Sequence, residues 1–206
     1  MLLELKNEII KYGDIIGEKN LSPGTSGNIS VRYRDKIIVT ASGVSNCELG
    51  YEDLVVIDFD GDVVDGDKKA SSEKMLHVEF YKKRPEINAI IHVHPTFLSS
   101  FAAARKGLVE PVMAENVYYF GKIPIAEYGL PSSKDLVDKT AKYFEEYNAV
   151  LMANHGFIVG DTDLKQAYLK LELAESYAQV VLNAKILGGA VLLNEKEVAE
   201  IEALKC

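Results

Sequence analysis

The chain has little cysteine, a deficit of positive charge and no long hydrophobic run. Its two cysteines, Cys47 and Cys206, have no metal-like or redox-like spacing, which excludes a cysteine-based motif and predicts free thiols in a reducing cytoplasm. The formal net charge of −8 and the lack of a basic stripe argue against a nucleic-acid partner. No apolar run approaches the roughly 20 residues that span a bilayer, and Glu4 and Lys6 bring charge too early for a signal peptide. We therefore expect a cytoplasmic protein that binds neither nucleic acid nor a membrane.

The length and composition are those of an ordinary globular domain. A chain of 206 residues, 48% hydrophobic and 26% charged, can bury a substantial core and predicts a single domain over residues 1–206. Helical and strand patterns mix without strict alternation. We therefore expect an α/β fold in which helices cover a central, partly antiparallel sheet.

Hydrophobic periodicity predicts where the elements lie. Ser71-Ser72-Glu73 is typical of a capped helix start, and we expect that helix to run to Lys83. Other helices are expected over residues 2–19, 95–106, 133–147, 164–187 and 195–205. Strands are expected over residues 28–32, 36–40, 54–59, 62–64, 88–94, 149–153 and 157–159. Residues 108–131 have no regular pattern.

Three of the four histidines form a pattern typical of a metal site. His92 and His94 are two residues apart in an apolar run, so a strand there would point both side chains to the same face. With His155 from a distant turn they could make a three-histidine site with an open position. A lone His-x-His pair is also compatible with two buried histidines, and Gly156 after His155 indicates only backbone freedom or close approach. Together the three predict a metalloenzyme, since an open divalent metal activates water or a substrate oxygen.

One acidic residue and one further histidine lie on the helix expected after Ser72. Taken alone, Glu73 is a helix N-terminal acid favoured by the helix dipole. Beside three metal-binding histidines, its carboxylate would be a natural fourth ligand or proton carrier. His77 follows one helical turn later, and we expect it to pack or to form hydrogen bonds.

Three polar loops could form an anion cradle. Residues 24–28 precede a predicted strand, residues 40–43 follow one, and Ser71-Ser72 opens a predicted helix. Each loop offers hydroxyls and free backbone N–H groups, which suit a phosphate. Any one of them could instead be a turn or a cap.

Five ordered motifs resemble those of the class II aldolase/adducin family. They are Thr25-Ser26-Gly27-Asn28-Ile29-Ser30, Ala41-Ser42-Gly43, Ser71-Ser72-Glu73, His92-x-His94 and His155-Gly156. The resemblance extends over nearly the whole chain and is greatest to the branch that cleaves L-fuculose 1-phosphate. It implies a three-layer αβα sandwich and a homotetramer with the active site at a subunit interface.

The same resemblance implies a role for each motif. His92, His94 and His155 would hold one Zn²⁺ per subunit, with another divalent metal possible. Glu73 would be a metal ligand in the substrate-free enzyme and the catalytic acid/base. The residues that would bind the substrate phosphate are Gly27, Asn28, Ser42, Gly43, Ser71 and Ser72. The implied activity is that of an aldolase, reversible cleavage of a (deoxy-)ketose 1-phosphate into dihydroxyacetone phosphate and an aldehyde.

The chain departs from the family pattern at Met113. The fuculose-phosphate branch has there a tyrosine that acts on the aldehyde end of the substrate in the neighbouring subunit, and methionine cannot transfer a proton. Glu115, Tyr118 and Tyr119 lie nearby. Related dehydratases and epimerases use a carboxylate at about this point, so Glu115 is the candidate second acid/base, unless it is a surface or salt-bridged acid. The departure bears on substrate identity.

Three other functions remain open. A methylthioribulose-1-phosphate dehydratase would share the metal and the cradle but expel a hydroxyl. A pentose-phosphate 4-epimerase is less favoured, because that branch has Ser-Ser-Asp in place of Ser71-Ser72-Glu73. An adducin-like binding module would need no metal ligands, although all the expected ones are present here.

Overall fold

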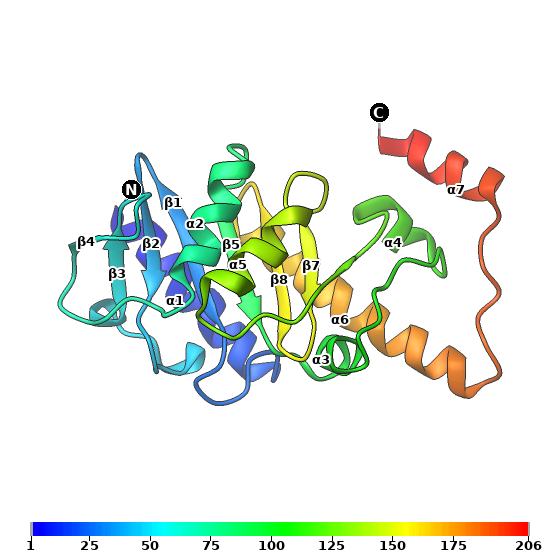
Figure 1. The fold of residues 1–206 in the computed structure, drawn as a ribbon, viewed down its shortest axis with the longest axis horizontal. Coiled ribbons are helices and arrows are strands. Elements are labelled where there is room, and N and C mark those ends of the chain that lie inside the picture. The colour runs from blue at the N-terminus through cyan, green and yellow to red at the C-terminus, as the bar shows by residue number, and fades with distance from the viewer. Residues whose placement is uncertain (1, 206) are drawn as a thin grey trace.

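The computed structural model describes residues 2–205 as one eight-stranded sheet covered by helices (Figure 1). The strand order is β4-β3-β2-β1-β5-β8-β7-β6. The strands are β1 (Asn28–Tyr33), β2 (Lys36–Thr40), β3 (Leu54–Ile57), β4 (Val63–Asp65), β5 (Ala89–Val93), β6 (Ile125–Ala126), β7 (Ala149–Met152) and β8 (Gly156–Asp161). Within the described residues β6 and β7 pair in parallel and the other neighbours pair antiparallel. The sheet is therefore mixed, as expected.

Helices lie on both faces of this sheet. They are α1 (Leu2–Glu18), α2 (Lys74–Lys83), α3 (Thr96–Ala103), α4 (Ala114–Tyr119), α5 (Lys134–Thr140), α6 (Leu164–Ile186) and α7 (Glu195–Glu202). Short 3₁₀ turns cover Asn46–Glu48, Tyr51–Asp53, Ala141–Tyr143 and Ala203–Lys205. Among residues 2–205, we find no helix whose length and apolar character would let it cross a membrane.

The three layers follow from strands that are apolar on both faces. In β2, Ile38 belongs to a core shared with α1, α3 and α6, whereas its neighbours Ile37 and Val39 belong to a core shared with α2 and α5. Successive side chains of a strand point to opposite faces, so each strand feeds both cores. Figure 1 shows α2 and α5 in front of the sheet, with α1 and α6 behind it. The predicted αβα sandwich is confirmed.

Some predicted boundaries were wrong. The helix expected from Ser71 begins at Lys74, because the backbone N–H of Ser71 donates to the carbonyl of Thr40 and the Ser71 hydroxyl accepts the N–H of Glu73. The predicted helix over residues 133–147 does start at the Ser133 cap but ends at Thr140. Residues 108–131 contain α4 and β6, elements too short for a periodic pattern to reveal.

Candidate functional site

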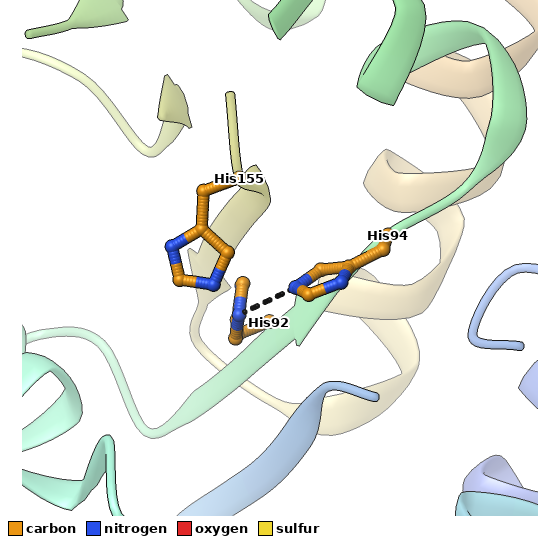
Figure 2. Close-up of side chains that lie close together, drawn as sticks. All are labelled: His92, His94 and His155. Carbon is orange, nitrogen blue, oxygen red and sulfur yellow. Dashed lines mark hydrogen bonds between the residues drawn. The ribbon is translucent and has the colours of Figure 1, made fainter. Parts of the chain in front are cut away.

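The imidazoles of His92, His94 and His155 point toward one another at the end of β5 (Figure 2). Their ring centroids are 4.8 to 5.0 Å apart. His92 lies in β5 and His94 directly follows its last residue, so the two keep the alternation of an extended chain. His155 belongs to the tight turn between β7 and β8. The ligand nitrogens of the three residues all lie within 4.8 Å of one another.

The turn before β8 explains why Asn154 and Gly156 flank His155. Asn154 has a φ of +55°, in the left-handed region that asparagine tolerates better than most residues. Gly156 has no unusual φ, but a Cβ there would lie 2.4 Å from Cδ2 of His94 and 2.8 Å from the carbonyl oxygen of Val93. The glycine is therefore required by close approach: it leaves the space in which the His94 ring sits.

Backbone contacts and burial leave the imidazole nitrogens available as ligands. Nδ1 of His92 donates to the carbonyl oxygen of Phe157 at 2.9 Å, because a carbonyl can only accept. Nε2 of His92 therefore carries the lone pair and faces the other two rings. Burial, followed by the electrostatic effect of the adjacent His92, lowers the pKa of His94 to about 3 and that of His155 to about 4. Both rings are therefore neutral at pH 7, the form that binds a metal.

Glu73, the N-cap residue just before α2, completes the cluster. Its Oε2 lies 3.0 Å from Nε2 of His92, and its Oε1 lies 3.3 Å from Nε2 of His155. Burial alone would raise the pKa of Glu73, but the adjacent imidazole of His92, then that of His155 and the hydrogen bond from Asn28, lower it below the ordinary carboxyl range. Glu73 is therefore an ionised carboxylate in contact with two of the three histidines.

These four side chains fit a divalent metal. Tetrahedral zinc with Zn–N bonds of about 2.0–2.1 Å places neighbouring ligand atoms about 3.3 Å apart. The separations of 3.0 and 3.3 Å from Glu73, and of 3.1 Å between Nε2 of His92 and of His94, are close to that value. Among the described residues, Oε1 of Glu73 is a buried atom without a hydrogen bond. A cation among the four groups would satisfy it.

Two of the polar loops predicted to bind an anion lie side by side next to Glu73. The loop after β2 and the loop before α2 are joined by a bridge between Ala41 and Ala70, and the N–H of Ser42 donates to the carbonyl of Lys69 at 2.9 Å. The third loop ends at Asn28, whose Nδ2 donates to Oε2 of Glu73 at 3.3 Å. The structure therefore brings together the segments named from sequence.

The six candidate phosphate residues differ in exposure. Asn28 and Ser71 are buried, whereas Ser42, Gly43 and Ser72 are exposed and Gly27 is intermediate. Gly27 and Gly43 both have a φ of +80°. A Cβ at Gly27 would lie 2.5 Å from the carbonyl oxygen of His92, so this loop needs glycine to pass close behind β5.

A hollow of about 530 Å³ between α2 and α5 opens beside this cradle. Ser72, Glu73 and Ser132 contribute to its lining, but none of the three histidines does. The Ser132 hydroxyl donates to the Ser72 hydroxyl at 2.8 Å, and Ser132 has a φ of +63°. The hollow thus lies next to the histidine cluster, on the side of the anion cradle. No sequence pattern predicted the hydrogen bond between Ser132 and Ser72.

The candidate second acid/base lies apart from the cluster in the single chain. Glu115 is exposed on α4, and Met113 is the partly buried residue that precedes this helix. Tyr118 and Tyr119 are on the same helix, with Tyr119 51% exposed. Within residues 2–205 no hydrogen bond or ion pair joins Glu115 to the histidines. The part expected for Glu115 therefore stays a prediction.

Two further residues support the cluster without belonging to any motif. The Glu175 carboxylate on α6 accepts the N–H groups of Phe97 and Leu98, both at 2.8 Å, and so caps α3 just after His94. His77 is fully buried, with hydrogen bonds to Ser30 and Asn28, which confirms the expectation that it packs or forms hydrogen bonds. Glu175 has no local sequence signal, because the cap comes from a distant helix.

Comparison with known proteins places this site in a family. The sequence profile described as "Class II Aldolase and Adducin N-terminal domain" matches residues 7–182. The chain therefore belongs to the class II aldolase/adducin family, as its motifs predicted.

Individual relatives match nearly the whole chain. The 5-deoxy-D-ribulose 1-phosphate aldolase of Bacillus thuringiensis serovar kurstaki is 32% identical over 204 residues, covering 98% of this chain and 95% of its own. The 3-oxo-tetronate 4-phosphate decarboxylase of Haemophilus influenzae is 32% identical over 183 residues, covering 86% of this chain and 87% of its own. A solved structure of an L-fuculose 1-phosphate aldolase is 34% identical, with a TM-score of 0.92 and coverage of 98% and 95%. The predicted fold is thereby confirmed.

Proposed function

We propose that this chain is a zinc-dependent aldolase that cleaves a (deoxy-)ketose 1-phosphate, such as L-fuculose 1-phosphate, into dihydroxyacetone phosphate and an aldehyde. The observation that carries the proposal is the contact of the Glu73 carboxylate with His92 and His155 beside His94. An ionised carboxylate that shares a metal site with three imidazoles can both bind the metal and, once protonated, transfer a proton. The chain as a whole, residues 1–206, would act as one catalytic domain in the cytoplasm.

The cradle and the relatives both favour a phosphorylated substrate. Asn28 and Ser71 lie beside Glu73, and the backbone around Ser42 and Gly43 is exposed for an anion. The three relatives described above carry a phosphate ester in the name of their substrate. We propose that Gly27, Asn28, Ser42, Gly43, Ser71 and Ser72 hold that phosphate and so fix the reacting carbons near Glu73.

The side chains divide the proton transfers between them. His92, His94, His155 and, before substrate binds, Glu73 would hold the cation, which would supply Lewis-acid polarisation of the substrate carbonyl. A base removes the proton of the C4 hydroxyl, C3–C4 breaks, and the bond's electron pair stays with the dihydroxyacetone phosphate fragment. Glu73 would take up a proton from solvent once the substrate replaces it at the cation, and an Oε atom would then deliver that proton to C3. The base that removed the C4 proton returns it to solvent. Glu115 of a neighbouring copy is the proposed base at C4, in a homotetramer with the site at the subunit interface.

The test is release of dihydroxyacetone phosphate from L-fuculose 1-phosphate and related deoxy-ketose 1-phosphates by zinc-loaded protein. We expect release that His92→Ala abolishes through loss of metal, and that Glu73→Gln abolishes while the protein remains folded. No release from any of these substrates by protein that binds zinc would refute the aldolase assignment.

The Haemophilus influenzae relative supports a second candidate reaction. Its name describes decarboxylation of a 3-oxo acid phosphate, and loss of CO₂ from such an acid also leaves an electron pair beside a carbonyl. The same metal and cradle would serve that chemistry, as they would serve the dehydratase and epimerase reactions. Release of CO₂ from a 3-oxo-tetronate 4-phosphate, measured beside the aldolase assay, distinguishes the two.

A further inference from the structure

A line of five buried polar side chains joins α2 to β1, and we call it the polar seam: Asn28, Ser30, Glu73, His77 and Tyr81. They are between 0% and 8% exposed. Tyr81 Oη lies 2.9 Å from the Ser30 hydroxyl, which lies 2.7 Å from Nδ1 of His77. Nε2 of His77 bonds to Oδ1 of Asn28, and Nδ2 of Asn28 bonds to Glu73. The seam thus runs from the middle of the core to the candidate metal site.

The seam exists because the periods of the two elements match. On α2 its members are four residues apart, a rise of about 6 Å. On β1 they are two residues apart, a rise of about 6.6 Å. Helix positions 73, 77 and 81 therefore meet strand positions 28 and 30 in alternation along the interface. Asn28 is also the register partner of His92 in β5, so the end of the seam lies at the histidine cluster.

The hydrogen-bond donors of the seam have a single consistent direction. The Glu73 carboxylate only accepts, so the Asn28 amide nitrogen faces it and the Asn28 carbonyl oxygen faces His77. That oxygen also only accepts, so Nε2 of His77 carries the proton. Burial lowers the pKa of His77 to about 3, and the neutral ring then has an unprotonated Nδ1 that accepts the Ser30 hydroxyl proton. The direction of each hydrogen bond in the seam thus determines the direction of the next one.

We infer that His77 is a positioning residue, which holds the carbonyl of Asn28 and thereby turns the amide N–H groups of Asn28 toward Glu73 and the anion cradle. The amide nitrogen has two hydrogens, one for Glu73 and one for an anionic ligand. An amide rotated by 180° would place its oxygen against the Glu73 carboxylate and against the ligand, and both contacts would be repulsive. The part concerning the ligand rests on the proposed function, whereas the amide orientation does not.

A role confined to satisfying buried polar groups would give different results. In that case, loss of His77 would lower stability but leave the Asn28 amide as it is. The informative pair of variants is His77→Leu, which removes the donor, and His77→Gln, whose side-chain N–H can replace that of Nε2. The control is Tyr81→Phe, which removes a seam hydroxyl while leaving both hydrogen bonds of His77 in place.

The first measurement is hydrogen exchange of the Asn28 side-chain NH₂ in zinc-loaded protein labelled with ¹⁵N-asparagine, with its signal assigned by its loss in Asn28→Ala. We expect slow exchange in the wild type, in His77→Gln and in Tyr81→Phe, and exchange at least tenfold faster in His77→Leu. Ser30→Ala, a small change that removes the partner of Nδ1, should also speed the exchange, and it serves if His77→Leu does not fold. Unchanged exchange in the folded donor-removing variants, or equal loss in Tyr81→Phe, would overturn the inference.

The second measurement is a double-mutant cycle on the dissociation constant of inorganic phosphate. His77→Leu should weaken phosphate binding about tenfold in the wild-type background and should have no effect in the Asn28→Ala background. His77→Gln should restore binding to within about twofold. Equal effects in both backgrounds would mean that His77 does not act through Asn28. Neither measurement needs turnover, so an enzyme without aldolase activity would refute the proposed function and leave this inference standing or falling on its own results.

Discussion

Replacing Gly156 with alanine should remove His94 from the metal site without a direct change to any ligand. The added Cβ would meet Cδ2 of His94 at 2.4 Å, whereas ordinary carbon contacts begin near 3.5 Å. The ring would have to retreat by about 1 Å. Metal–ligand distances tolerate shifts of about 0.2 Å, so the displacement is several times what coordination allows. We therefore expect zinc affinity to fall at least 100-fold, or about 2.7 kcal/mol.

The matched control is Gly160→Ala on the same strand. A Cβ there would meet Ile87 at 3.0 Å and Phe80 at 3.2 Å in the core, away from the histidines. Overpacking of this kind costs about 1–3 kcal/mol of stability. Gly160→Ala should therefore lower the melting temperature while zinc affinity stays close to that of the wild type.

The assay is competition for zinc between the protein and a chromophoric chelator, with circular dichroism to confirm that each variant is folded. Folded Gly156→Ala protein with wild-type zinc affinity would refute the argument, because His94 would then have moved without leaving the site or would not be a ligand. Equal loss of affinity in both glycine variants would show that the effect is general strain in β8.

Three other outcomes are expected. Burial lowers the pKa of His77 to about 3 from its ordinary value of 6.5, so the unfolded chain binds about one more proton than the folded chain between pH 4 and 6, and stability falls as the pH falls through that range. In urea titrations, His77→Gln should therefore flatten that dependence by about 1.4 kcal/mol per pH unit, and an unchanged slope would contradict a neutral His77. Glu175→Ala should lower the free energy of unfolding by about 2 kcal/mol in the same titrations, because the N–H groups of Phe97 and Leu98 lose a charged acceptor, and a change below 0.5 kcal/mol would mean that water replaces the cap. Glu115→Gln should cut aldehyde release at least 100-fold while zinc affinity is unchanged, and an active variant would turn attention to Tyr118 and Tyr119.

The histidine cluster could be predicted from sequence because strand alternation is a local rule. His92 and His94 share a face although β5 ends at Val93, since the chain stays extended for one more residue. The central mixed sheet followed from helical and strand patterns that mix without strict alternation, and the three-layer sandwich followed from the resemblance to the family. The helix start at Ser71 was misplaced because Ser-Ser-Glu is typical of a cap, whereas Ser71 is bound by the neighbouring loop.

Other parts of the site depend on contacts that no local pattern contains. Gly156 could be needed for a turn or for close approach, and only the position of the His94 ring decides between them. The role of His77 requires knowing that α2 packs against β1 in one register. The part of Glu115 stays a prediction, because no hydrogen bond or ion pair within the described residues joins it to the histidines.

The position of β5 has a consequence for how the protein folds. This strand lies between β1 and β8, and the four candidate ligands come from the start of α2, the end of β5 and the turn before β8. No short stretch of chain holds more than two of them, so a metal cannot bind tightly until pairings between distant segments have formed. Such non-local pairings form late and slowly. A bound ion would therefore stabilise the folded state without helping to form it. The ratio of the free metal concentration to the dissociation constant would set how strongly unfolding of the sheet is suppressed.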